Sequence, residues 1–202
     1  NLLDLESALS TVLEFEYDQK QNASKIINAA VILKHNNPCG AALADSPSDA
    51  FRKALDCDST SAFGGIVAFN NNVDLATAEL LSNIFLECVV APSFDKEALE
   101  ILSNKKNLRL LILNKENIKL DNKATFKSIL GGILEQDNDN EIDQQNEWSC
   151  VTQTKPNTEE FNDLIFSWKI CKHVKSNAIV IARNQKTIGI GAGQMNRVGA
   201  AK

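Results

Sequence analysis

Hydrophobic residues near the start of the chain predict a helix followed by a buried strand. Between Asp4 and Phe15 apolar residues recur at helical spacing, and the polar residues 16–25 are expected to form a loop. The apolar run Val31–Leu33 then has the character of a buried strand, and it stops at Lys34-His35 and the turn-forming sequence Asn-Asn-Pro-Cys-Gly. Lys34 and His35 are therefore expected at a strand end, where α/β proteins keep their chemistry.

Strand and helix patterns alternate as far as residue 113. Ser46, Asp74 and Ser93 are predicted helix caps, because Ser and Asp side chains accept hydrogen bonds from the first turn of a helix. The predicted segments are a helix over 47–57, a turn over 61–65, a strand over 66–69, a helix over 74–85, a strand over 88–91, a helix over 93–102 and a strand over 108–113. This alternation predicts an α/β fold.

The pattern then changes, and it divides the chain into three parts. Residues 1–113 form a first unit, residues 114–160 form a polar connector with short strands expected at 129–134 and 148–151, and residues 161–202 start a second unit. The last part shows a helical stripe, a strand from Ala178, a polar turn at 184–186, a strand over 187–190 and a helix near Arg197. The stripe consists of Phe161, Leu164, Ile165 and Trp168.

The second unit repeats the order of the first and stops before its later elements. The chain therefore contains about one and a half copies of one unit, which would leave a sheet edge uncovered. We expect the sequence to be cut short, or completed by something outside it.

Composition and charge are those of a globular protein without a nucleic-acid or membrane surface. The 202 residues are 44% hydrophobic and 23% charged, and the formal net charge is −5 with no long cluster of Lys and Arg. Five cysteines fall in no paired metal spacing, and the sequence shows no signal peptide and no long apolar span. These observations predict a cytosolic protein with reduced thiols.

Lys34 and His35 are the first candidates for chemistry. At a strand end, a neutral imidazole can accept a proton while a neighbouring ammonium stabilises developing negative charge. The alternative is a solvated surface pair. Pro38-Cys39 matches half of a zinc deaminase signature, but no His-x-Glu occurs, so no zinc is expected and Cys39 is interpreted as a buried filler.

Three further segments could contact a ligand. Ser61–Gly65 offers backbone N–H groups and the ring of Phe63, which suit a phosphate or a flat heterocycle, although an ordinary turn is an equal alternative. Gly189–Gln194 is glycine-rich but is not a dinucleotide-binding fingerprint. Asn177 precedes a strand, where its amide could hold a substrate or cap the backbone.

Six blocks of the sequence resemble the aminoimidazole carboxamide ribonucleotide (AICAR) formyltransferase family. They run in family order over nearly the whole chain outside the connector, and they comprise Lys34–Gly40 (KHNNPCG), Ser61–Asn70 (SAFGGIVAFN), Glu87–Phe94 (ECVVAPSF), Lys105–Leu111 (KKNLRLL), Trp168–Val180 (WKICKHVKSNAIV) and Gly189–Val198 (GIGAGQMNRV). The resemblance implies a tandem pair of cytidine-deaminase-like, three-layer α/β/α units without zinc. The first would be complete here and the second only begun.

The resemblance also implies a reaction: transfer of a formyl group from 10-formyl-tetrahydrofolate to the 5-amine of AICAR, in the synthesis of inosine monophosphate. By resemblance, His35 accepts a proton from the attacking amine, Lys34 stabilises the transition state and Asn177 holds the carboxamide region of the substrate. The remaining expected substrate contacts are Phe63, Gly64, Glu87, Arg197 and Val198.

Further expectations concern assembly and extent. The resemblance implies a homodimer in which Asn177-type and His35-type residues come from different subunits. It also implies that the family's inosine monophosphate cyclohydrolase domain and the residues that finish the second unit both lie outside this sequence, so that the fragment alone is expected to have little or no activity. The alternatives are a nucleotide-binding module that keeps the fold without the chemistry, and a zinc deaminase.

Overall fold

The computed structural model describes residues 1–21, 27–113, 124–139 and 147–202. Residues 1–113 and 156–202 form one compact unit, and residues 114–155 form a second. The strands of the first unit are β1 (Asn28–Lys34), β2 (Asn37–Ala44), β3 (Gly65–Phe69), β4 (Leu86–Ala91), β5 (Arg109–Ile112), β8 (Ile179–Arg183) and β9 (Lys186–Gly191). Its helices are α1 (Leu2–Gln21), α2 (Pro47–Leu55), α3 (Ser59–Ala62), α4 (Leu75–Ser82), α5 (Lys96–Ser103), α6 (Thr158–Lys172) and α7 (Arg197–Ala201).

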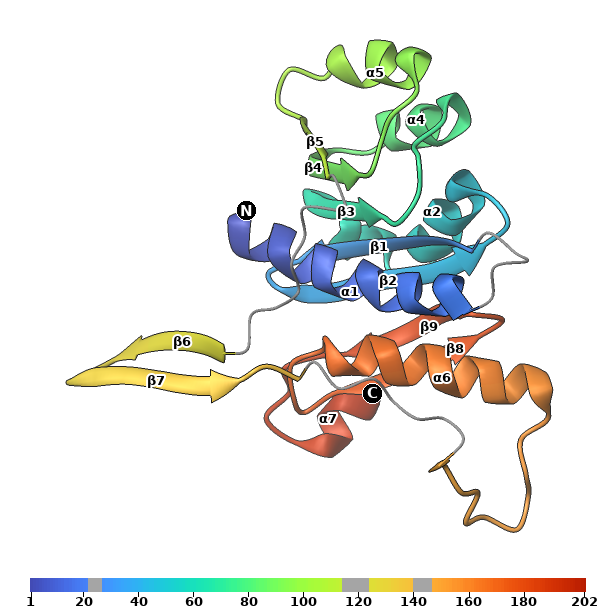
Figure 1. The fold of residues 1–202 in the computed structure, drawn as a ribbon, viewed down its shortest axis with the longest axis vertical. Helices are drawn as coiled ribbons and strands as arrows, with labels where there is room; N and C mark the ends of the chain where they lie inside the picture. Colours follow the sequence, from blue (N-terminus) through green and yellow to red (C-terminus); the bar gives the residue numbers. More distant parts are fainter. Residues whose placement is uncertain (22–26, 114–123, 140–146) are drawn as a thin grey trace. The chain divides into compact units, whose positions relative to one another are not determined.

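The strands of the first unit form one mixed sheet with helices on both faces, which confirms the predicted α/β class (Figure 1). The strand order is β5-β4-β3-β1-β2-β9-β8, so the strands after residue 160 extend the sheet of the first block. The more specific deaminase-like arrangement stays a prediction. Within the described residues, no helix has the length and apolar character needed to cross a membrane.

Alternating side chains of β1 divide the core into two layers. Ala30 and Ile32 pack in a cluster with α2, α4 and α5. Ala29, Val31 and Leu33 point the other way, into a cluster with α1 and α6. Because both faces of this strand are covered, its sequence is apolar from Ala29 to Leu33 and shows no alternation.

The turn after β1 is shorter than predicted. Only His35 and Asn36 form it, with φ angles of 53° and 58°, which is the backbone of a two-residue hairpin turn. Asn37, Pro38 and Gly40 are turn formers by sequence but lie in β2. Pro38 is tolerated there because the pairing of β1 with β2 is irregular at Leu33. Gly40 is required by packing, since a Cβ there would lie 1.9 Å from the carbonyl oxygen of Ala54 in α2.

A second hairpin, β8–β9, resembles the first. Its turn residues Asn184 and Gln185 also have positive φ angles, of 54° and 53°. In β9, a Cβ on Gly191 would lie 1.9 Å from the carbonyl oxygen of Ala200 in α7, just as Gly40 meets α2. The two hairpins meet through β2 and β9, which pair antiparallel in the middle of the sheet.

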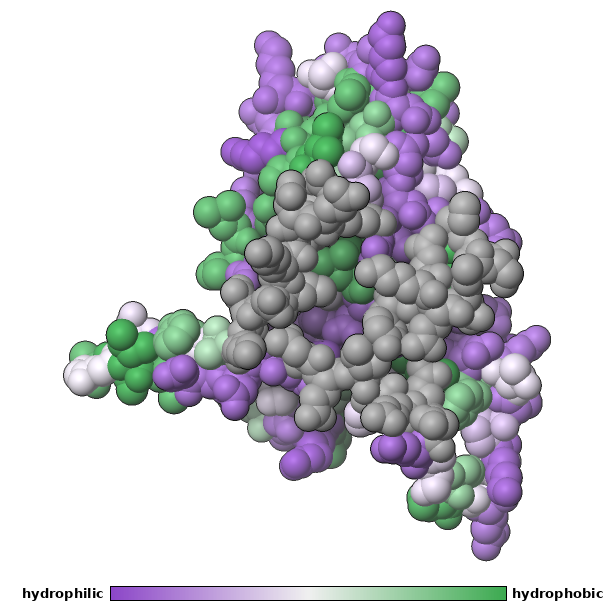
Figure 2. Space-filling model, viewed as in Figure 1, coloured by the Kyte–Doolittle hydropathy of each residue, from purple (hydrophilic) through white to green (hydrophobic). Residues whose placement is uncertain are grey.

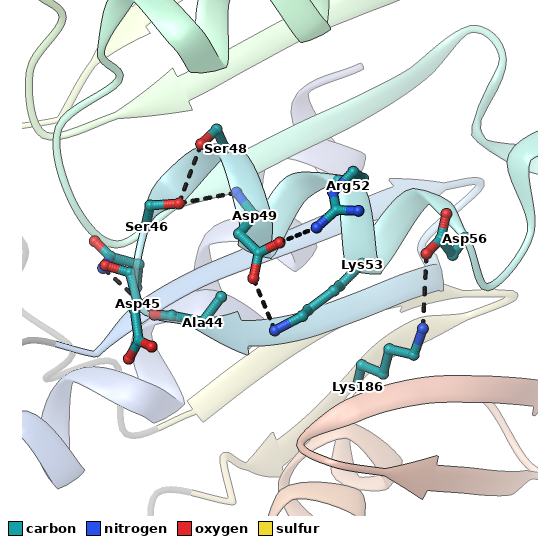
Figure 3. A network of polar contacts seen from close by, with 10 residues as sticks. Ala44, Asp45, Ser46, Ser48, Asp49, Arg52, Lys53, Asp56 and Lys186 are labelled. Atoms are coloured by element: carbon teal, nitrogen blue, oxygen red, sulfur yellow. Dashed lines mark hydrogen bonds and ion pairs between the residues drawn. The ribbon is translucent and has the colours of Figure 1, made fainter.

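The helix cap at Ser46 is confirmed. Its Oγ accepts a hydrogen bond from the backbone N–H of Asp49 at 3.1 Å, at the start of α2 (Figure 3). The Asp49 carboxylate then pairs with Arg52 and, at 2.8 Å, with Lys53. At the other end of the helix, Asp56 lies 3.6 Å from Lys186, an ion pair that connects α2 with β9 (Figure 3).

Several predicted helix boundaries are wrong. α1 continues to Gln21 through residues expected to be a loop, and residues 22–26 lie outside the described residues. α4 starts after Asp74, as predicted, but ends at Ser82 and not at residue 85. Asp95, not Ser93, precedes α5, and the Ser93 hydroxyl instead donates a hydrogen bond to the Asn72 Oδ1.

The exposed and buried faces of α6 differ from the predicted stripe. Leu164 and Trp168 are 54% and 56% exposed, whereas Phe166 and Ile170 are buried. The ring of Phe166 stacks on Phe15 of α1 with 5.5 Å between centroids. The packing of α1 against α6 therefore selects a neighbouring face of the helix.

The second unit contains a hairpin of β6 (Ala124–Ile129) and β7 (Gly132–Asp137). Gly131, with φ 81°, completes the turn, so the predicted strand over 129–134 is instead the end of one strand, a turn and the start of the next. Hydrophobic side chains, including Phe126 and Ile133, are exposed along this hairpin (Figure 2). Residues 148–151 form no strand, and the polar tract at 140–146 lies outside the described residues.

Candidate active site

A cavity of about 780 Å³ opens where β1 ends, and both sequence blocks contribute to its wall. Most of the charged and polar lining residues come before residue 113, while residues after 160 supply a largely apolar and glycine-rich surface together with Gln194 and Lys202. The principal lining residues are Lys34, His35, Asp58, Ser61, Ile179, Gly191 and Gln194. Lys34 and His35 thus share one cavity, as expected for residues at a strand end.

Lys34 is held by the segment that follows α3. Its Nζ donates a hydrogen bond to the carbonyl oxygen of Phe63 at 2.6 Å. The next residue, Gly64, has a φ of 74°, and a Cβ built on it would lie 4.0 Å from that Nζ. The backbone N–H of Gly64 donates to the carbonyl oxygen of Phe85 at 2.8 Å, and the ring centroids of Phe63 and Phe85 lie 5.3 Å apart. The structure therefore places Phe63 and Gly64 beside Lys34.

His35 occupies an exposed position on the fixed hairpin turn. The neighbouring backbone N–H of Asn36 donates to the Asp4 carboxylate at 2.6 Å, which ties the turn to α1. His35 lines the cavity described above and also a second one, of about 530 Å³, beside Asp4. Its imidazole can therefore meet a ligand in either cavity, although the backbone that carries it is held in place.

Asn177 reaches the site through Gln194. The backbone groups of these two residues exchange hydrogen bonds, at 3.1 and 3.2 Å, and the Asn177 Nδ2 also donates to the Gln194 carbonyl at 2.9 Å. The backbone-capping role that the sequence left open is therefore observed. The Asn37 Oδ1 also accepts from the backbone N–H of Lys175 at 3.1 Å, which joins the first hairpin to the Asn177 segment.

Glu87, Arg197 and Val198 do not line the cavity among the described residues. The Glu87 carboxylate pairs with Arg109 at 2.9 Å. Arg197 and Val198 begin α7, and Val198 is 65% exposed. Gly199, Ala200 and Ala201 of the same helix do line the cavity, so α7 forms part of its wall. Phe63, Gly64 and Asn177 are not in the lining either, but they contact residues that are, Lys34 and Gln194.

Two cysteines also line the cavity, Cys39 and Cys57. Burial raises the pKa of the Cys39 thiol to about 12, and burial also raises the pKa of Cys57. A thiolate nucleophile is therefore scarce at neutral pH. In the part of the chain that the structure describes, no group of three or more His, Cys, Asp or Glu side chains could hold a metal ion.

Sequence reasoning missed Asp58, which caps α3 and lines the cavity. The sequence pattern there predicts a turn, which needs no helix cap. A signal was present, because Asp58 and Ser61 have the spacing of an N-cap and the third residue of a helix. Asn37 was missed as well, because its partner Lys175 lies 138 residues away.

Comparisons with known proteins give the same family along the whole chain. A family model described as AICARFT/IMPCHase bienzyme matches residues 1–202. The chain is 64% identical over 202 residues to the bifunctional purine biosynthesis protein PurH of Prochlorococcus marinus strain MIT 9515, and 57% identical to that of strain NATL2A. These matches cover 100% of the chain, which spans 39% of the length of these relatives.

Similarity to solved structures is weaker. A putative formate dehydrogenase accessory protein from Desulfotalea psychrophila matches with a TM-score of 0.38 at 8% identity, over 52% of each chain. Acinetobacter baumannii RibD matches with a TM-score of 0.43 at 16% identity, over 55% of this chain and 36% of RibD.

Proposed function

The chain belongs to the AICARFT/IMPCHase bienzyme family, and from that premise we propose that it carries the Lys-His part of a formyl-transfer site. The substrates would be AICAR and 10-formyl-tetrahydrofolate, and the product formyl-AICAR, an intermediate of purine synthesis. The observation that carries the proposal is that Lys34 and His35 line one cavity, with the ammonium of Lys34 fixed 2.6 Å from the Phe63 carbonyl oxygen.

The reaction needs a base and a stabiliser of negative charge. The 5-amine of AICAR attacks the formyl carbon, a carbon–nitrogen bond forms, and the formyl oxygen gains negative charge. His35 would accept the proton that the attacking nitrogen loses, and Lys34 would stabilise the charge on the oxygen. The tetrahedral intermediate then collapses, the bond to N10 of the folate breaks, and tetrahydrofolate leaves after N10 takes up a proton.

The remaining roles follow from family resemblance. Asn177, Phe63, Gly64, Glu87, Arg197 and Val198 would contact the two substrates. A second copy of the protein would complete the site, and the reaction would take place in the cytosol. Arg197 and Val198 begin α7, whose residues Gly199, Ala200 and Ala201 line the cavity, so a ligand there would lie close to them. Glu87 is not in the lining among the described residues, so its contribution would require a ligand that extends beyond this cavity or a second subunit.

The test uses a protein that carries this chain at the full length of its relatives. Formation of formyl-AICAR and tetrahydrofolate should require both substrates together. AICAR binding without transfer would contradict the proposal in favour of a binding module. Stoichiometric zinc together with release of ammonia from a nucleoside or nucleotide would contradict it in favour of a deaminase.

A further inference from the structure

The short helix α3 depends on Asp58. The Asp58 carboxylate accepts hydrogen bonds from the backbone N–H and the Oγ of Ser61, at 2.8 and 2.5 Å. A helix of four residues contains very few internal hydrogen bonds, so such a cap contributes a large part of what fixes it. Asp58 therefore anchors the first turn of α3, which leads directly to Phe63 at its other end.

α3 ends at the carbonyl group that holds Lys34. Phe63 is the C-terminal cap of α3, and its oxygen accepts the 2.6 Å hydrogen bond from Lys34 Nζ. The lysine side chain has a flexible four-carbon stem, so its ammonium points wherever such a partner fixes it. Any shift of α3 would therefore be transmitted to the ammonium group.

We infer that Asp58 is a positioning residue for Lys34 and acts by capping α3, an inference that rests on the proposed role of Lys34 in formyl transfer. Asp58 lines the same cavity as Lys34. The pKa of the Asp58 carboxyl is lowered mainly by the hydrogen bonds from Ser61, and the charge of Lys34 lowers it further. Asp58 is thus ionised at neutral pH, as a carboxylate cap of this kind requires.

The chain contains a matched control at Asp74. Asp74 caps α4 in the same manner, because its Oδ1 accepts from the backbone N–H and the Oγ1 of Thr77, at 2.8 and 2.6 Å. Among the described residues that line the cavity, none belongs to α4. Loss of the Asp74 cap should therefore cost stability without moving Lys34.

The experiment compares Asp58→Ala, Asp58→Asn and Asp74→Ala in the full-length protein. Asp58→Ala should lower kcat for formyl transfer about tenfold or more while KM for AICAR stays within about threefold. The displaced Lys34 ammonium would stabilise less well the negative charge on the formyl oxygen, and this charge develops only in the transition state. Asp58→Asn should restore at least about a third of kcat, because Asn caps helices as well as Asp. Asp74→Ala should lose as much thermal stability as Asp58→Ala and keep kcat within about twofold.

A second readout reports on Lys34 without any turnover. The rate at which acetic anhydride labels Lys34, followed by mass spectrometry, should rise about threefold or more in Asp58→Ala, because the hydrogen bond to Phe63 is weakened. The rate should stay at the wild-type value in Asp58→Asn and Asp74→Ala. If Asp58→Ala does not fold, Ser61→Ala, which removes only the hydroxyl donor, should change the rate in the same direction by a smaller factor.

Equal effects of Asp58→Ala and Asp74→Ala on kcat, with unchanged labelling of Lys34, would overturn the inference. So would an Asp58→Asn variant as impaired as Asp58→Ala, since the carboxylate charge and not the cap would then be what matters. If the wild-type protein transfers no formyl group, the proposed function fails, whereas the labelling contrast still decides whether Asp58 positions Lys34.

Discussion

Gly64 shows how closely the backbone is specified beside Lys34. Its φ of 74° lies in the left-handed region, and a Cβ there would make only ordinary contacts, 3.6 Å from the ring of Phe85. The Gly64→Ala variant should therefore lose about 1–2 kcal/mol of unfolding free energy from backbone strain alone. Urea unfolding measures this loss.

The control for that variant is Gly189→Ala. A Cβ added at Gly189 would have no heavy atom within 4 Å, and the φ angle of Gly189 is not positive. This substitution should leave the unfolding free energy unchanged or raise it slightly, because alanine restricts the unfolded chain. A Gly64→Ala variant as stable as Gly189→Ala would show that alanine accepts the backbone conformation at residue 64 without strain.

Among single residues, the sequence could predict those that follow a buried strand, but not those that act through distant partners. Lys34 and His35 stand out because an apolar run ends abruptly at them. Asp58 does not, because its importance depends on the Phe63 carbonyl meeting Lys34, a contact between segments 29 residues apart. A sequence pattern contains no information of that kind unless the two segments are already known to be neighbours.

Among the elements, β2 and α2 approach each other closely at Gly40. Because a Cβ there would lie 1.9 Å from a backbone oxygen, Gly40→Ala must push the helix from the strand. The expected loss of unfolding free energy is about 3 kcal/mol or more, at the upper end of overpacking effects. The same urea titration measures it against Gly189→Ala, and a loss below about 1 kcal/mol would mean that α2 moves away without cost.

The packing of α1 against α6 includes an ion cluster that should make stability depend on pH. The Glu14 carboxylate lies 3.0 Å from both Lys172 and His173, at the end of α6, and the Lys169 ammonium donates to the Glu14 carbonyl oxygen at 3.2 Å. Burial raises the pKa of Glu14, but the hydrogen bonds from His173 and Lys172 outweigh it, so the pKa is lowered overall.

A lowered pKa in the folded state stabilises the protein above the unfolded-state pKa, and this contribution is lost as pH falls through the folded-state value. Wild type should therefore exceed Glu14→Gln in unfolding free energy by up to about 1 kcal/mol at pH 7, and the difference should shrink below pH ~4. Thermal unfolding of wild type and Glu14→Gln between pH 7 and about pH 3 measures this difference in unfolding free energy. A difference that is constant with pH would show that the Glu14 charge contributes nothing.

The sequence predicted strands correctly where both faces of the strand are buried. Residues 66–69 and 88–91 lie in strands covered on both faces, so their apolar runs mark them clearly. The prediction failed for α6, where Leu164 and Trp168 are apolar but exposed, because periodicity identifies an apolar face without showing what covers it. α3 has only four residues, too few to show a period.

At the scale of the whole molecule, the sheet of the first unit joins segments that are far apart in the sequence. β2 pairs with β9 through Ala42 and Lys186, and Thr187 exchanges hydrogen bonds with the backbone of Ala41. The sequence indicated that a second hairpin exists but could not indicate which strand it joins, since such non-local pairing leaves no local pattern. The cavity wall depends on this pairing, because it places Gly191 and Gln194 in the same cavity as Lys34.

His35 is the proposed base of the formyl-transfer reaction, so its replacement probes the proposed function at the proton-transfer step. His35 has a positive φ of 53°, so His35→Asn is the better variant beside His35→Ala, and Asn184→Ala, at φ 54° in the like turn, controls for backbone cost. In the full-length protein, both His35 variants should lose about 100-fold or more in formyl-transfer rate while AICAR affinity stays within about tenfold. Asn184→Ala should keep its activity. Transfer rates within a few fold of wild type in both His35 variants, or an equal loss of rate and affinity, would show that His35 is not the base.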